Sequence, residues 1–199
     1  KLDQKTMLTA IIIVWAVIMV VRMYIINGRN KEYSGMLEQL DKILTEDNDP
    51  EKYIRKCNDY IRKVDDEAFK EMLKLNSATG YSCMCKYDEA IDVLKSVDLS
   101  LLNPGHRIVA MNNLAQYSYL IGDTDAGNKY VNDNFDNMRR YVGNKNFAAT
   151  FMITFAFYYY YKGNKNKANE FCEKVIEFIK NSGSESEGDM YILKKLEEL

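Results

Sequence analysis

The sequence predicts an all-α protein in which a single N-terminal transmembrane helix is followed by an α-solenoid of antiparallel helix pairs. Three observations support this prediction. Residues 7–26 are almost entirely apolar. Beyond residue 30, apolar residues recur at spacings of three and four, the period of an amphipathic helix. Only 2 Pro and 10 Gly interrupt the 199 residues, and the usual turn signals of β-hairpins are missing.

The composition is that of a globular protein with one sizeable core. Hydrophobic residues make up 47% of the chain, charged residues 28%, and the formal net charge is −2. A protein that binds nucleic acid usually carries a concentrated basic face, so this near-neutral balance argues against that class. The abundance of Lys, Asn, Ile and Tyr is typical of an AT-rich bacterial genome.

The stretch MLTAIIIVWAVIMVVRMYII, residues 7–26, predicts a membrane anchor within an N-terminal region of residues 1–30. Twenty helical residues span about 30 Å, the thickness of the hydrocarbon core. Arg22 is the one charged residue, and it lies a turn from the end, where its side chain can reach the headgroups. A signal peptide is the alternative, but the apolar run is too long and no small-x-small cleavage site follows.

The charges that flank this stretch favour a single-pass protein whose remaining domain is cytoplasmic. The C-terminal side carries three basic residues and one acidic residue, against two and one on the N-terminal side. Basic residues concentrate on the cytoplasmic side of membrane proteins. Residues preceding Lys1 would change this balance, so the opposite orientation stays open.

No motif predicts catalysis, a cofactor or a metal ion. Cys57, Cys83, Cys85 and Cys172 contain no CxxC, and the single His106 offers no zinc-site spacing, so we interpret the thiols as buried small hydrophobes. The nucleotide, P-loop, HExxH and GxSxG motifs are missing. Acidic runs at 65–69 and 88–90 lie at predicted helix starts, where carboxylates offset the helix dipole. We therefore expect neither an enzyme nor a small-molecule substrate.

Start and stop signals divide the chain into about nine helices, nearly all of 12–18 residues. The loops between them hold Asn48-Asp49-Pro50, Asn103-Pro104-Gly105, Gly122-Asp123, Gly143-Asn144 and Gly163-Asn164. The expected organisation is an anchor over 1–30, helical repeats over 31–181, and a linker with a C-terminal capping helix over 182–199.

The helices form pairs that repeat along the chain. Corresponding turns begin at Cys85, Gly122 and Gly163, at spacings of 37 and 41 residues, and a step of 37 back from Cys85 reaches Asn48. Small residues flank each of the last three turns, where they let two helices approach closely: Ala78 and Ala90, Ala115 and Gly127, Ala156 and Ala168.

This pattern resembles the tetratricopeptide repeat family over roughly residues 34–181. FAFYYYYKGNKNKANEF is the best match, with Phe155-Ala156, Tyr159, Gly163 and Ala168 at the motif positions. The chain departs from the family in its longer periods, its few prolines and Asp41 in place of a small residue. An irregular solenoid and a non-repeating bundle remain alternatives. A second membrane span over 146–161 is disfavoured, because the run has only sixteen residues and carries several hydroxyl groups.

The resemblance implies that the first helices of the pairs line a concave surface that binds a protein or peptide. In this register we expect a polar middle and an aromatic end, made of Asn112, Gln116, Tyr119, Ile153, Phe157, Tyr160 and Tyr161. Tyr159 is expected inside its pair. The alternative for Tyr160 and Tyr161 is packing against the last helix. Leu75 and Thr79 occupy the places of the family's carboxylate clamp, so a binder of chaperone tails is disfavoured.

The expected function is that of a membrane-anchored scaffold for protein–protein interaction. The alternative is an envelope assembly or translocation accessory whose repeat domain lies outside the cytoplasm.

Overall fold

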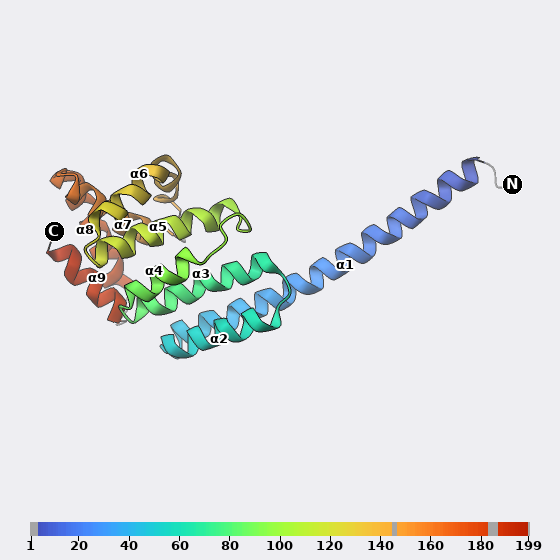
Figure 1. Ribbon diagram of the computed structural model, residues 1–199, viewed down its shortest axis with the longest axis horizontal. Helices are drawn as coiled ribbons and strands as arrows, with labels where there is room; N and C mark the ends of the chain where they lie inside the picture. Colours follow the sequence, from blue (N-terminus) through green and yellow to red (C-terminus); the bar gives the residue numbers. More distant parts are fainter. Residues whose placement is uncertain (1–3, 145–146, 183–186, 199) are drawn as a thin grey trace.

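The computed structural model describes residues 4–144, 147–182 and 187–198. These ranges form nine α-helices and contain no strand, which confirms the all-α prediction (Figure 1). The helices are α1 (Gln4–Thr45), α2 (Pro50–Lys63), α3 (Glu67–Cys83), α4 (Tyr87–Lys95), α5 (Pro104–Leu120), α6 (Thr124–Tyr141), α7 (Ala148–Tyr161), α8 (Lys165–Ser182) and α9 (Glu187–Glu197).

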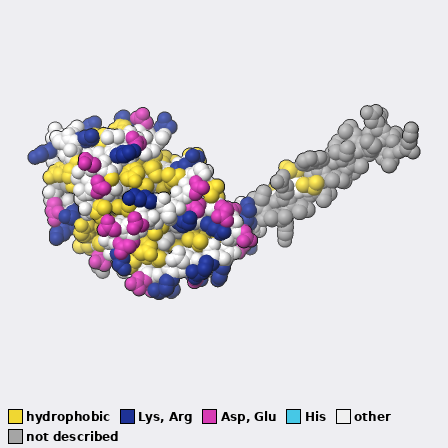
Figure 2. Space-filling view, viewed as in Figure 1, with side chains coloured by type: hydrophobic (Ala, Val, Ile, Leu, Met, Phe, Trp, Pro, Cys, Tyr) yellow, Lys and Arg dark blue, Asp and Glu magenta, His cyan; other side chains and the backbone are white. Residues whose placement is uncertain are grey.

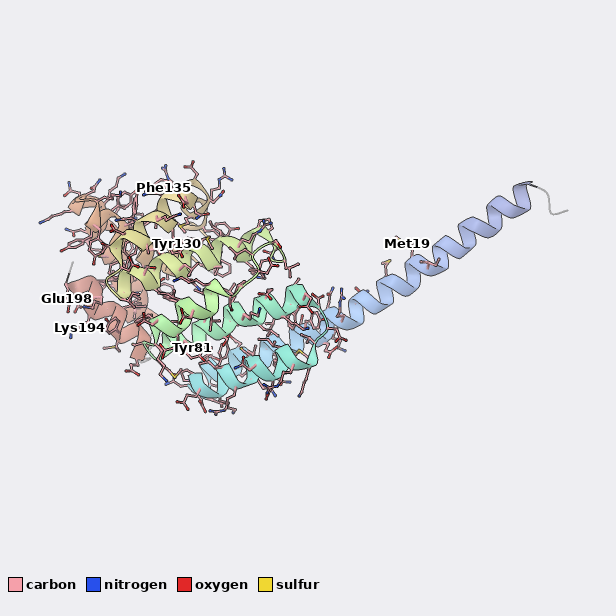
Figure 3. All side chains as sticks on the ribbon, in the orientation of Figure 1. Met19, Tyr81, Tyr130, Phe135, Lys194 and Glu198 are labelled. Carbon is pink, nitrogen blue, oxygen red and sulfur yellow. The ribbon has the colours of Figure 1, made fainter. Side chains whose placement is uncertain are left out.

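Helix α1 has two parts with different surroundings. Its N-terminal part projects away from all other helices, with Met19 on the projecting portion (Figures 1 and 3). Its C-terminal part belongs to the folded domain, where Leu40 and Ile43 are buried and Tyr33 stacks on Phe69 of α3 with ring centroids 3.9 Å apart. One continuous helix therefore joins the domain to the apolar stretch.

The predicted anchor at residues 7–26 lies mostly outside the residues whose side chains the structure describes. Of that stretch, the side chains of Ile18, Met19 and Met23 are described, and all three are exposed. Across the described part of the chain, no helix combines the length and the apolarity needed to cross a membrane.

The domain is built from four helix pairs, each joined by a tight turn. The pairs are the C-terminal part of α1 with α2, α3 with α4, α5 with α6, and α7 with α8, and most contacts join helices adjacent in the chain (Figure 1). Buried apolar side chains form two clusters, one among α1, α2 and α3 and a larger one that extends from α3 to α9.

The four turns within the pairs share one backbone feature. Asn48, Cys85, Gly122 and Gly163 are the described residues with positive φ, at 48°, 55°, 86° and 74°. In the last three turns, the N–H of the next residue donates to the carbonyl oxygen five residues back, at 2.8–3.0 Å, which is the Schellman geometry that ends a helix. The predicted turn positions and their spacings are therefore confirmed.

The small residues beside the turns lie where the paired helices meet. Ala78, Ala90, Ala115 and Ala156 are completely buried, and Ala168 is 1% exposed. A Cβ on Gly127 would lie 2.6 Å from the Tyr119 ring, closer than any side chain tolerates. These contacts bear out the expectation that small residues allow close approach within the pairs.

Helix α4 has nine residues, which is shorter than the 12–18 residues expected of nearly all the helices. Beyond its end, the chain is bonded to α3. The carboxylate of Glu71 accepts the N–H of Asp98 at 2.8 Å and pairs with Lys74 at 2.7 Å. The α4–α5 connection is thereby fixed against α3.

Helix α9 packs against α3 and α7 as well as α8. The expectation of a helix that merely caps the last pair is therefore incomplete. A Cβ on Gly188 would lie 3.0 Å from the carbonyl oxygen of Ser82, so α9 begins against the C-terminal end of α3. The last helix thus reaches back across two pairs.

Candidate functional site

The inner face is the surface formed by the first helices of three pairs, α3, α5 and α7. Its two halves differ, because α5 and α7 pack closely along their lengths whereas α3 and α5 share few contacts. All seven residues that the sequence assigns to a partner-binding surface lie on α5 and α7. Most of them are consequently used for contacts between these two helices.

The two amides predicted as the polar middle of a binding surface are buried. Asn112 is 0% exposed and Gln116 is 4% exposed. The Asn112 amide donates to the Thr150 hydroxyl at 3.2 Å, and that hydroxyl donates to Gln116 Oε1 at 2.9 Å. The expectation of exposed amides is wrong, because α7 covers both side chains. Thr150 of α7 bonds to Asn112 Nδ2 and Gln116 Oε1, while the buried Asn112 Oδ1 has no partner among the described residues.

The predicted apolar members of the surface are also buried. Tyr119, Ile153 and Phe157 are 3%, 6% and 2% exposed. The Tyr119 ring stacks on Phe157 with centroids 5.8 Å apart, and its hydroxyl donates to Asn128 of α6 at 3.1 Å. These side chains hold α5, α6 and α7 together, so the expectation that they are exposed is wrong.

The first two tyrosines of the run 158–161 connect α7 to different helices. The Tyr158 hydroxyl donates to Asn132 Oδ1 of α6 at 2.9 Å. Tyr159 stacks on Phe171 of α8, with centroids 5.8 Å apart and planes within 8°. The predicted position of Tyr159 inside the α7–α8 pair is confirmed.

Tyr160 and Tyr161 lie at the outer end of the run. The Tyr161 ring is stacked on Tyr119, with centroids 5.5 Å apart, yet the residue is 41% exposed. Tyr160 is half-buried and contacts Tyr161 edge to face. Helix α9 therefore leaves Tyr161 substantially open to solvent, contrary to the alternative in which the last helix buries it.

A groove of about 360 Å³ lies on the inner face, bounded by α3, α5, α7, α8 and α9. We call it the α3–α9 groove. Its polar lining comes from Thr79, Ser82, Asn113, Gln116 and Thr150, and its apolar lining includes Val109, Tyr117, Phe147, Ile153 and Ile192. The groove takes in Gln116 and Ile153 of the predicted surface residues, but none of the other five.

None of the described residues that line the groove carries a charge. Burial raises the pKa of Tyr117 to about 12 and also raises the pKa of Tyr87, so both phenols remain protonated at neutral pH. In the described part of the chain, no three His, Cys, Asp or Glu side chains lie together in a way that would hold a metal ion. The groove is thus an uncharged surface of hydroxyl, amide and apolar groups.

Helix α9 is itself bound to the inner face as an amphipathic helix. Ile192, Leu193 and Leu196 are buried, whereas Lys194 and Glu198 project from its outer side (Figure 3). Tyr191 of α9 stacks at a tilt on Tyr87, with centroids 5.6 Å apart, and the Cys85 thiol donates to the Glu187 carbonyl oxygen at 3.8 Å. The apolar side of α9 is therefore held by α3, α7 and α8, with further contacts from α4 and the α3–α4 turn.

Sequence reasoning did not predict the α3–α9 groove. The groove depends on the contact of α9 with α3, which joins residues about a hundred positions apart. Two features of the sequence could have indicated the contact between α9 and α3. One is Gly188, and the other is the apolar residues at 192, 193 and 196, whose spacing gives α9 one apolar side.

The fold and the groove define an all-helical protein of stacked helix pairs that holds a helix of its own on its inner face. In comparisons with known proteins, no family model matches the chain, and no significant similarity is found to a curated protein or to a solved structure.

Proposed function

We propose that this protein is a membrane-anchored, tetratricopeptide-like α-solenoid scaffold that binds an amphipathic helix of a partner protein on its inner face. The observation that carries the proposal is the seating of α9. Its apolar side packs on α3, α7 and α8 while its charged side faces outward. Helix-in-groove recognition by repeated apolar anchors is a common mode of peptide binding.

The α3–α9 groove is the place for the partner's anchoring side chains. Its volume of about 360 Å³ lies at the low end of the range for binding pockets, about 300–1,000 Å³. This volume suits large side chains projecting from a helix that lies beside α9. The hydroxyl and amide groups of Thr79, Ser82 and Asn113 offer hydrogen bonds along the rim, while Val109 and Ile192 offer apolar contact.

The membrane anchor is supported by the sequence of residues 7–26 and by the continuity of α1. No break separates the apolar stretch from the domain, since α1 extends to Thr45. Arg29, three residues after Ile26, already contacts the domain through Asp66 at 3.5 Å. An anchored domain would therefore be held rigidly against the membrane surface. Fractionation of cells that express the full chain, with and without an alkaline carbonate wash, tests the anchor directly.

We further propose that the repeat domain is cytoplasmic, with an envelope accessory outside the cytoplasm as the competing function. No disulfide joins the four cysteines, all of which lie in the described part of the chain, and reduced thiols fit a reducing compartment. Intact cells treated with a membrane-impermeant thiol reagent after mild denaturation distinguish the two. Labelling of Cys83, Cys85 and Cys172 without lysis would contradict the cytoplasmic assignment.

Site-specific photo-crosslinking in native membranes tests the binding surface. A photoreactive residue at Thr79, inside the groove, should give a discrete adduct with a partner protein. The same residue at the exposed Glu89 of α4, outside the groove, is the matched control and should give none. Adducts of the same size from both positions, or none from Thr79, would contradict a partner site in the groove.

A further inference from the structure

A second pocket is separate from the inner-face groove. It has a volume of about 800 Å³ and lies between the first half of α5, the α4–α5 connection and the last half of α6. Two arginines, Arg107 and Arg140, line it together with Asn137 and Tyr141, and Met111 contributes apolar surface. No acidic residue is among the described residues that line it.

The two arginines have no counter-charge. Both are exposed, and neither forms an ion pair with any residue in the described ranges. Two guanidinium groups that share one pocket raise its positive potential, which an anion would relieve. The planar guanidinium group also matches the geometry of phosphate oxygens through paired hydrogen bonds.

The helix dipole favours a cation at the position of Arg140 but not at the position of Arg107. Arg140 lies in the last turn of α6, where a cation offsets the negative end of the helix dipole. Arg107, by contrast, lies near the start of α5, which carries no acidic residue in its first turn. A cation is unfavourable there, because that end of the helix is already positive. The position of Arg107 is therefore better explained by an anion in the pocket than by the helix.

Neutral donors are placed beside the arginines. A Cβ on Gly105 would lie 3.4 Å from the Tyr141 hydroxyl, so this hydroxyl sits against the first turn of α5, the end where helix N–H groups face anions. The Asn137 amide is exposed in the same pocket. The arginines, the phenol and the amide give the lining of the pocket several hydrogen-bond donors suited to an oxyanion.

The pocket lies at the end of the domain from which α1 leaves. The α4–α5 connection contributes Leu99 to the pocket, while its Leu101 and Asn103 border a second hollow together with Arg29 and Tyr33 of α1. Figure 1 shows the same placement, with the α4–α5 connection at the end from which α1 projects. Leu101 is 42% exposed there. Since a helix rises about 1.5 Å per residue, Arg29 lies only about 4–5 Å along α1 from the end of the apolar stretch.

We propose that this pocket binds the phosphate headgroup of an anionic membrane lipid, with Arg107 and Arg140 on the phosphate and Met111 beside the glycerol and upper acyl chains. The proposal rests on the membrane anchor proposed above, because the anchor brings this end of the domain to the lipid surface. Charged side chains of both signs are mixed over the visible face of the domain (Figure 2). Attraction to the lipid would thus come from the pocket rather than from a broad basic surface.

Thermal unfolding of the full chain in a neutral detergent tests the proposal. Short-chain phosphatidylglycerol is the anionic probe, short-chain phosphatidylcholine the zwitterionic probe, and inorganic phosphate the free anion. A ligand at ten times its Kd should raise the melting temperature by about 3–6 °C for a chain of this size. We expect this rise with phosphatidylglycerol alone.

Two variants separate the pocket from general charge. Arg107→Gln with Arg140→Gln should abolish the rise, while Arg139→Gln, which removes the neighbouring exposed charge outside the pocket, should preserve it. Since these side chains are exposed, each variant without ligand should melt close to the parent chain. An equal rise with inorganic phosphate would assign the pocket to a soluble phosphate ligand and overturn the lipid proposal. The absence of any rise, or its loss in Arg139→Gln, would overturn the site itself.

The anchor and the pocket can fail separately. The detergent assay reports on the pocket without requiring insertion in a bilayer, and carbonate fractionation reports on the anchor without requiring lipid in the pocket. A chain recovered in the soluble fraction that still responds to phosphatidylglycerol would refute the anchor alone. A membrane-bound chain with no response would refute the pocket alone.

Discussion

The inner face is open between α3 and α5 and closed between α5 and α7. On the closed side, Asn112 and Gln116 are buried around the Thr150 hydroxyl, and Gln116 and Thr150 also border the edge of the groove. On the open side, Thr79 and Asn113 line the groove that α9 borders. Helix α5 belongs to both halves of the inner face. The difference between the halves therefore arises from the side chains that α3 and α7 place against α5.

Side-chain size accounts for the two spacings. Helix α7 begins with Ala148, Ala149 and Thr150, which are small enough to let it approach α5. On the other side, the bulky Tyr117 of α5 is buried and lines the groove together with Ser82 of α3. Small residues within the pairs therefore let the paired helices approach closely, whereas the size of the residues between the pairs decides where a groove opens.

The largest loss of stability is expected from substitutions on the closed side, between α5 and α7, because the residues there belong to the core. Replacing Asn112 and Gln116 with alanine together removes two buried side chains and leaves the Thr150 hydroxyl without its acceptor. We expect a loss of about 3 kcal/mol in the free energy of unfolding, measured by urea denaturation of the chain in neutral detergent. Unchanged stability would mean that α7 does not lie on α5 as described.

The next largest loss of stability tests whether the helices of the α3–α4 pair and of the α7–α8 pair are packed equally closely. Ala156→Leu in α7 and Ala78→Leu in α3 each overfill a completely buried contact between paired helices. Each change should cost about 1–3 kcal/mol, as is usual for overpacked cores, and the two costs should be similar. A large cost at Ala156 with none at Ala78 would show that the repeat does not extend to the open side.

A smaller effect is expected at the aromatic end of α7. Tyr160→Ala with Tyr161→Ala removes one half-buried and one exposed ring, so the loss of stability should be about 1 kcal/mol, chiefly from the Tyr119–Tyr161 stack. If these rings serve a partner, crosslinking through the groove should weaken about tenfold, since a lost aromatic anchor commonly costs more than 1.4 kcal/mol of binding. A stability loss of several kcal/mol would instead place both rings in the core.

The smallest effect on stability is expected on the open side. Thr79→Ala with Asn113→Ala is the matched partner of the double change at Asn112 and Gln116, because it also shortens two polar side chains on neighbouring positions of the inner face. Asn113 is itself only 7% exposed, but both side chains border the groove, where solvent can replace the lost atoms, so the cost should stay below about 1 kcal/mol. Partner crosslinking from the groove should nevertheless fall. A cost equal to that of the closed side would remove the distinction between the two halves.

Features encoded locally were predictable from the sequence, whereas contacts between distant residues were not. The turns at Asn48, Cys85, Gly122 and Gly163 follow from helix-ending residues and a regular period, and the structure has a positive φ at each. The burial of Asn112 was not predictable, because an amide on a helix is equally suited to solvent and to a partner such as Thr150. Only the three-dimensional placement of α7 decides between them.

The position of α9 could not be predicted for the same reason. Its apolar residues show that one side is buried, but the pattern does not say against which helix. The decisive contact is between Gly188 and the end of α3, where the absence of a side chain lets two backbones meet. The sequence therefore predicted the helix and its amphipathic character, and the structure supplied its place on the inner face.

Chemical trapping of α9 tests the central claim most directly. Glu187→Cys puts a second thiol on the residue whose carbonyl oxygen lies 3.8 Å from Cys85 Sγ. Mild oxidation of the full chain should join position 187 to Cys85, as identified by mass spectrometry of the digested protein. Lys194→Cys, on the outer side of α9, is the control and should form no such link. A link at Lys194→Cys and none at Glu187→Cys would show that α9 does not lie on the inner face.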